Sequence, residues 1–196
     1  MSTVAAKRLL PAAASAERRL TRTGPGVGPL PPSVTRNALL AGGSDERFRQ
    51  IVHDLMLISD AVRIVRSHFG SLLGVSGPQY VLLMAVARGQ SDEGMSASQV
   101  AEYLRVSNAF VTIASRVLIE RGLLKKRSHP DDGRSVLLQL SARGRRAIEA
   151  IAPRMQSIND RFFAGLTHTS FDHAEQILTS LADGARDALD RIDELN

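Results

Sequence analysis

The chain has 196 residues, of which 43% are hydrophobic and 23% charged, and its formal net charge at pH 7 is +5. A chain of this length and composition removes roughly two thirds of its surface from water on folding, so we expect an ordinary globular domain with its own core. The sequence contains no cysteine, which excludes disulfides, thiolate metal sites and thiol redox chemistry. Its apolar runs are far shorter than the roughly 20 residues of a membrane span, so we expect no transmembrane helix.

The charge is unevenly distributed along the chain. Residues 105–154 contain eleven basic and four acidic residues, whereas residues 160–196 contain three basic and eight acidic ones. A domain that collects positive charge in one segment usually presents it to a polyanion, although a solvated basic face is the structural alternative.

Residues 1–44 contain five of the eight prolines, six basic residues and one acidic residue. Because apolar residues follow no sustained period there, we predict a flexible, basic, Pro/Gly-rich N-terminal extension before a domain at 45–196. An organellar transit peptide has a similar composition and remains an alternative.

Amphipathic helices are predicted on both sides of the basic segment. Apolar residues recur in steps of three and four from Phe48 to Phe69, which indicates a long helix with a seam suited to a partner helix. A second helix opens at 76–78 and ends at Gly89. A third helix follows Ser141, and Pro153 should bend it. A fourth helix begins near 169–170.

The segment from Ser96 to Arg121 predicts a helix-turn-helix. Ser96 and Gln99 form a capping box that opens a short helix ending at Leu104. After a three-residue break, Ser107 is a good N-cap for a longer helix through Arg121. A short capped helix, a turn and a longer capped helix make this motif.

Beyond Gly122 the apolar period changes from 3.6 to 2. Residues 124–127 and 135–140 read as two strands joined by a turn at 129–133, with Val136, Leu138 and Leu140 expected on one face. A basic hairpin after a helix-turn-helix is a wing. The expected fold class is therefore mainly α with a small β-hairpin wing, a winged helix-turn-helix.

The second helix of the motif has a composition suited to the major groove of DNA. We expect its inner face, Val111, Ala114, Ser115 and Leu118, to pack against the first helix. Asparagine can pair with adenine, threonine can meet a base edge or a thymine methyl, and arginine can bind guanine or phosphate. The candidate DNA-binding residues on this helix are Ser107, Asn108, Ala109, Thr112 and Arg116. For each one, a role as cap or helix surface is the alternative.

The wing supplies a second group of candidates. Arg134 could enter the minor groove, where the negative potential is enhanced, and Asp132 could orient its guanidinium group. Lys125, Lys126 and Arg127 would hold phosphates and make binding strongly dependent on salt.

From Met95 to Gly144 the sequence resembles the MarR (multiple-antibiotic-resistance regulator) family of bacterial transcription factors. The resemblance rests on Met-Ser-Ala-Ser-Gln-Val-Ala-Glu-Tyr-Leu at 95–104, Val-Ser-Asn-Ala-Phe-Val-Thr at 106–112, Leu-Ile-Glu-Arg-Gly-Leu-Leu at 118–124 and the Asp-x-Arg of the wing. Gly-Pro-Gln-Tyr at 77–80 also looks like the second helix of the family, so the likeness covers about 150 residues from Asp45 onward.

The resemblance implies a cytoplasmic bacterial repressor that responds to a ligand and associates with the nucleoid when bound to DNA. It implies an obligate homodimer held by helical dimerisation regions at 45–70 and 142–196, with the winged helix at 76–141 on a near-palindromic operator. Two departures stand out: Ile113 and Gly133 occupy positions where many members have arginine.

The family also implies a small aromatic or carboxylate-bearing effector. His53, Arg63, Arg66 and His68 on the first long helix are candidates to bind it, although surface or interface roles are commoner for such residues. We expect no cofactor and no metal, since His168 and His173 lack further ligands at a zinc spacing.

Two other functions are alternatives to a specific regulator. The basic extension and the apolar reading helix would also suit an architectural DNA-binding protein with little sequence preference. An enzyme is disfavoured, because the sequence has no Gly-x-Ser-x-Gly, no His-Glu-x-x-His and no phosphate loop.

Overall fold

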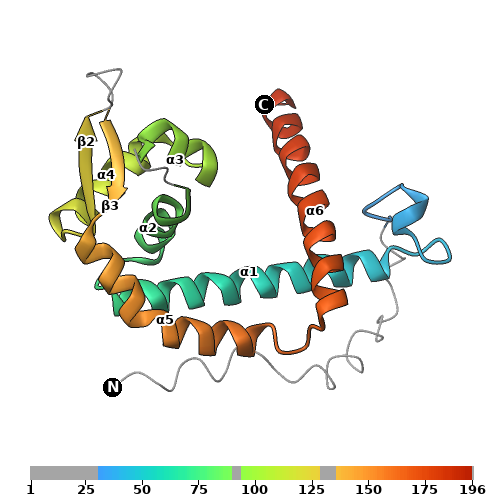
Figure 1. Ribbon diagram of the computed structural model, residues 1–196. Helices are drawn as coiled ribbons and strands as arrows, with labels where there is room; N and C mark the ends of the chain where they lie inside the picture. Colours follow the sequence, from blue (N-terminus) through green and yellow to red (C-terminus); the bar gives the residue numbers. More distant parts are fainter. Residues whose placement is uncertain (1–30, 90–93, 129–135, 196) are drawn as a thin grey trace, which may run out of the picture. The chain divides into compact units, whose positions relative to one another are not determined.

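The computed structural model describes residues 31–89, 94–128 and 136–195 (Figure 1). Within these residues it is mainly α-helical with one small antiparallel sheet, which confirms the predicted fold class. In chain order the elements are a 3-10 turn at Asn37–Leu39, α1 (Glu46–Leu72), α2 (Gly77–Gly89), β1 (Met95–Ser96), α3 (Ala97–Leu104), α4 (Asn108–Glu120), β2 (Leu124–Ser128), β3 (Val136–Leu140), α5 (Ala142–Phe162) and α6 (His168–Leu195).

The contacts divide the chain into two units, Met1–Met56 and Leu57–Asn196, with the division inside α1. In the first unit the carboxylate of Asp45 is buried and ion-paired with Arg49. It accepts hydrogen bonds from the hydroxyl and the backbone N–H of Ser33, each at 2.7 Å. The hydroxyl of Ser33, then its N–H, and the charge of Arg49 hold the pKa of Asp45 below its usual 3.8. These bonds connect Ser33, which lies in the predicted N-terminal extension, with the start of α1.

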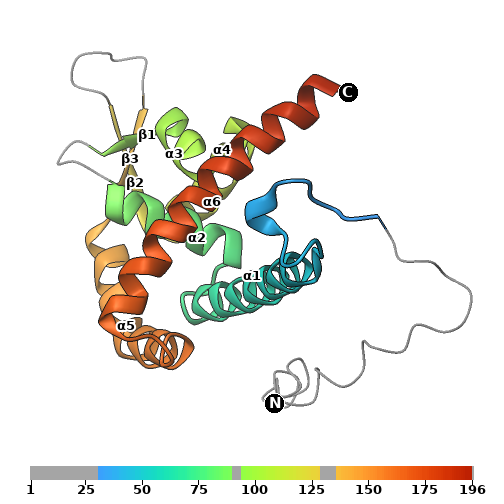
Figure 2. The ribbon, with the colours of Figure 1, turned by 90° about the vertical axis from the view of Figure 1, so that its right-hand side faces the viewer.

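The second unit has its core around α2. Leu82, Leu83 and Val86 on this helix are fully buried and belong to one apolar cluster with Val100 of α3 and Leu118 of α4. Figures 1 and 2 show α2, α3 and α4 grouped beside the sheet, and α2 contacts both helices and β3. Burial of each leucine or valine contributes about 1.5–3 kcal/mol, so this cluster holds the helix-turn-helix in place.

The helix-turn-helix begins and ends at the predicted caps. The backbone N–H of Gln99 donates to Ser96 Oγ at 3.1 Å, and the N–H of Ser96 donates to Gln99 Oε1 at 2.7 Å. Ser107 Oγ accepts from the N–H of Phe110 at 3.1 Å and opens α4. Arg105 adopts a left-handed conformation with φ 53°, which ends α3 and turns the chain towards α4.

The sheet has three strands in the order β1-β3-β2, so the prediction of a two-stranded hairpin missed β1. Met95 pairs with Leu138, and Leu124 pairs with Leu140. Burial does not alternate along β3 as its sequence suggests: Val136 is exposed, whereas residues 137–139 are all buried. A central strand that is covered on both faces has no solvent-exposed set of side chains, so the alternation disappears.

The last two helices follow their predicted positions. α5 continues through Pro153, and Figure 1 shows that it changes direction along its length. α6 is preceded by Thr167, whose Oγ1 accepts from the N–H of Ser170 at 3.2 Å. Among the α6 side chains that the structure describes, none is buried.

Candidate nucleic-acid interface and cavity

The two faces of α4 are as predicted. Val111, Ala114, Ser115 and Leu118 are all buried, and they turn the inner face of the helix towards the apolar cluster. The opposite side is exposed and carries the candidate DNA-binding residues Ser107, Asn108, Ala109, Thr112 and Arg116. The helix therefore presents a solvent-exposed surface of the size and shape that the major groove admits.

Several polar groups on this exposed face already have partners within the chain. Thr112 Oγ1 donates to the carbonyl of Asn108 at 2.9 Å, and Arg116 Nε donates to Glu120 Oε1 at 2.9 Å. Ser107 uses its hydroxyl oxygen as the helix cap. The Arg116–Glu120 pair is largely exposed, and such pairs contribute at most about 1 kcal/mol, so Arg116 can exchange Glu120 for a phosphate or a base.

Outside the buried inner face, the large apolar residues of α4 differ in their exposure to solvent. Phe110, Val117 and Ile119 are half-buried, so the helix is less apolar towards solvent than its sequence suggests. Ile113 is the exception, with 69% of its surface exposed.

Cationic side chains lie on the elements that follow α4. Lys125, Lys126 and Arg127 are exposed on β2. The first turns of α5 carry Arg143, Arg145 and Arg146. All three are exposed, and none of them was among the DNA-binding candidates from the sequence. Arg134 and Asp132, together with Gly133, lie outside the described residues.

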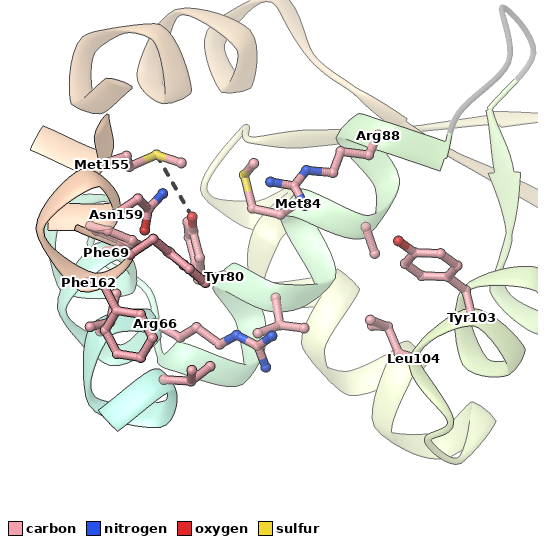
Figure 3. A pocket seen from close by; sticks show the side chains of 15 residues that line it. Arg66, Phe69, Tyr80, Met84, Arg88, Tyr103, Leu104, Met155, Asn159 and Phe162 are labelled. Carbon is pink, nitrogen blue, oxygen red and sulfur yellow. Dashed lines mark hydrogen bonds between the residues drawn. The ribbon is translucent and has the colours of Figure 1, made fainter. Parts of the chain in front are cut away.

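A cavity of about 480 Å³ lies among α1, α2, α3 and α5 of the second unit (Figure 3). Of the four effector candidates only Arg66 lines it. Arg63 is ion-paired with Asp60 instead, at 3.3 Å, and His53 belongs to the first unit. Sequence reasoning missed the other polar lining residues, because they come from helices that only the fold brings together: Tyr80, Arg88, Tyr103 and Asn159.

The cavity combines aromatic walls with two guanidinium groups. The rings of Phe69 and Tyr80 lie 5.7 Å apart, and the hydroxyl of Tyr80 donates to Met155 Sδ at 3.8 Å. Burial raises the pKa of Tyr80 above its usual 10.0, an effect that the charges of Arg88 and Arg66 partly oppose. In Figure 3 the side chains of Arg66 and Arg88 extend across the cavity from α1 and α2. This arrangement suits an anion with an apolar or aromatic body.

Residues 31–89, 94–128 and 136–195 contain no group of three or more possible metal ligands. No single helix among them is long and apolar enough to cross a membrane. Only α1 and α2 taken together have the length and composition of a membrane span, and a bend of 81° separates these two helices.

A model of the MarR family matches residues 73–135, which span α2 through β2 and the segment after it. Similar solved structures include a MarR protein from Peptoclostridium difficile, with a TM-score of 0.61, 18% identity, and coverage of 82% of this chain and 94% of that chain. CouR from Rhodococcus jostii RHA1 bound to p-coumaroyl-CoA has a TM-score of 0.60, 23% identity and coverages of 67% and 91%. The S. aureus MepR–DNA complex has a TM-score of 0.59, 15% identity and coverages of 68% and 96%.

No curated protein matches the sequence. The fold is a winged helix-turn-helix, an architecture that is typical of DNA-binding proteins. The predicted resemblance to the MarR family of transcription regulators is confirmed by the match at 73–135 together with the shared fold.

Proposed function

We propose that this chain is a ligand-responsive transcriptional repressor that acts as a cytoplasmic homodimer on a near-palindromic operator, and that it is not an enzyme. The observation that carries the proposal is α4, whose inner face is fully buried while its outer face presents Asn108, Thr112 and Arg116 to solvent. Two copies related by a two-fold axis would place two such helices in successive major grooves, which is why the operator would be near-palindromic.

The homodimer is supported by apolar side chains that the single chain leaves exposed on α6. This helix has 28 residues, and its apolar residues recur with helical spacing along one side. A contiguous apolar surface of this kind usually marks an interface. The large hydrophobic residues exposed on α6 are Phe171, Ile177, Leu178, Leu181, Leu189 and Ile192.

The proposed contacts to DNA differ in what they read. Asn108 and Arg116 would contact base edges, whereas Ser107 and Ala109 would position the start of α4. Lys125, Lys126 and Arg127 would hold phosphates, and Arg134, oriented by Asp132, would enter the minor groove.

The test compares a duplex selected from genomic fragments with a random duplex of equal length across a salt series. We expect the selected duplex to bind at least about a thousandfold more tightly. Asn108→Ala should weaken only the specific complex, by about 1–3 kcal/mol. Lys125→Ala with Lys126→Ala should weaken both complexes and reduce the salt slope by about 0.9 for each phosphate that the variant no longer binds.

Arg191→Ala is the matched control, because this cation on α6 is already ion-paired with Glu194 at 3.2 Å. Its salt slope should equal that of the unmodified chain. Equal affinity for selected and random duplexes would contradict the proposal and favour an architectural DNA-binding protein.

We further propose that the effector is an aromatic carboxylate, held in the cavity with its carboxylate between Arg66 and Arg88, or the CoA thioester of such an acid, whose negative charges lie on the phosphates of its CoA part. CouR, which shares the fold, was solved with p-coumaroyl-CoA. The aromatic lining of this cavity, including Tyr80 and Tyr103, offers ring contacts to the body of such a molecule.

Calorimetric titration with p-coumarate and p-coumaroyl-CoA tests the effector site. Arg66→Ala should weaken binding by about tenfold or more, because a hydrogen bond to a charged group contributes about 1.5–3 kcal/mol. Arg63→Ala, three residues earlier on α1 and outside the cavity, should leave the affinity unchanged. Equally weakened binding in the two variants would contradict the assignment of the cavity.

A further inference from the structure

We propose that Ile113 contacts the C5 methyl group of a thymine in the major groove, and that it thereby makes thymine the preferred base at that position of the operator. The proposal rests on the proposed function and deepens it, since it names a base that α4 reads. Ile113 was not among the DNA-binding candidates.

The first argument is the unusual exposure of this side chain. Ile113 is 69% exposed, more than any other large hydrophobic residue of the described chain. The other bulky apolar residues of α4 are buried or half-buried, down to 0% exposure for Val111 and Leu118. An isolated exposed isoleucine is ordinary on a protein surface. This one, however, lies on the side of α4 that faces away from the core.

The second argument is that Ile113 does not stand alone on that side. Ala109 lies four residues before it, and Thr112 lies next to it; both are exposed, and both carry a methyl group. Residues three and four apart share one side of a helix, so Ala109, Thr112 and Ile113 together form a small methyl-bearing strip.

The third argument is the state of the polar groups around this strip. The hydroxyl of Thr112 donates to the carbonyl of Asn108, and Arg116 is paired with Glu120. Both groups are therefore engaged within α4, whereas the side-chain amide of Asn108 is exposed at the start of the helix. The polar groups near Ile113 are thus the amide of Asn108 and the guanidinium group of Arg116, which must leave Glu120 before it can bind DNA, whereas Ala109 and Thr112 present methyl groups.

The C5 methyl group of thymine is the one methyl group that the four bases present in the major groove. A guanine or cytosine opposite Ile113 would place a hydrogen-bonding edge against a side chain that cannot bond it, and that edge would lose its water. A thymine would instead bury its methyl group against the isoleucine. The chemistry of this face therefore selects thymine at the position that Ile113 reaches.

The test uses the tightest duplex selected from a random library, in which each thymine is replaced in turn by uracil. Uracil keeps the same base pair and removes only the C5 methyl group. We expect a thymine in each half-site where uracil weakens binding of the unmodified chain by about fourfold, the factor that burial of one methyl group contributes. In Ile113→Ala this penalty should disappear at that position.

Two further variants sharpen the result. Ile113→Val keeps methyl groups at the same place and should retain most of the uracil penalty, while Asn108→Ala should lose affinity but keep the penalty in full. Because Ile113 is exposed, we expect its alanine variant to unfold at the same urea concentration as the unmodified chain.

The possible outcomes separate the two proposals. A selected duplex that binds specifically but shows no uracil-sensitive thymine, or a penalty that persists in Ile113→Ala, would overturn the role of Ile113 and leave the proposed function standing. The absence of any selected duplex that binds better than random DNA would overturn both.

Discussion

A chain carrying Ile177→Glu and Leu181→Glu is expected to be monomeric and to lose operator binding by at least about a hundredfold. Both side chains are exposed on α6, by 59% and 45%, so the substitutions should leave the fold of the single chain intact. In a dimer they would place unpaired carboxylates in an apolar interface, which disfavours association by several kcal/mol. A monomer carries only one reading helix and loses the joint binding of two half-sites.

Sedimentation equilibrium measures the effect directly, and fluorescence anisotropy on the selected duplex measures the loss of affinity. Thr179→Glu is the matched control, because residue 179 lies two positions from Ile177 and thus on the other side of the helix. This variant should remain dimeric. A dimer that persists with both glutamates on the apolar side would exclude α6 from the interface.

The second large effect is expected from Leu118→Ala, which should lower the free energy of unfolding by about 3 kcal/mol. Leu118 is fully buried between α4 and the apolar cluster, so its truncation removes apolar contacts and leaves a cavity. Ile113→Ala on the same helix should change stability by less than about 0.5 kcal/mol, because its side chain is mostly in water already.

Urea unfolding followed by circular dichroism distinguishes the two variants, with protein concentration held fixed because dimerisation contributes to stability. Comparable destabilisation by Leu118→Ala and Ile113→Ala would mean that the two faces of α4 are assigned the wrong way round. Such a result would remove the basis for the proposed DNA interface.

The predictions from sequence succeeded where the interacting residues are close along the chain, and they failed where those residues are far apart. The caps at Ser96 and Ser107 were predictable because their partners lie three residues away. The buried face of α4 was predictable from its period. β1 was not, because Met95 and Ser96 make a strand too short to show any period, and only its pairing with β3 defines it.

The DNA-reading candidates and the cavity differ in the same way. Asn108, Thr112 and Arg116 come from one helix, so their common exposure could be predicted from spacing alone. The lining of the cavity is contributed by four helices, and the sequence indicated Arg66 but neither Arg88 nor Tyr103. No local pattern marks residues that meet only when separate helices pack together.

The winged helix-turn-helix, its helix caps, the inner face of α4 and the resemblance to the MarR family could all be predicted, because each depends on residues that are neighbours along the chain. Only the packing of the folded chain shows that β3 is buried on both faces, that Ile113 stands in solvent and that Arg66 and Arg88 share a cavity. These features depend on which side chains are covered and on the rotamers they adopt, and packing between distant segments sets both.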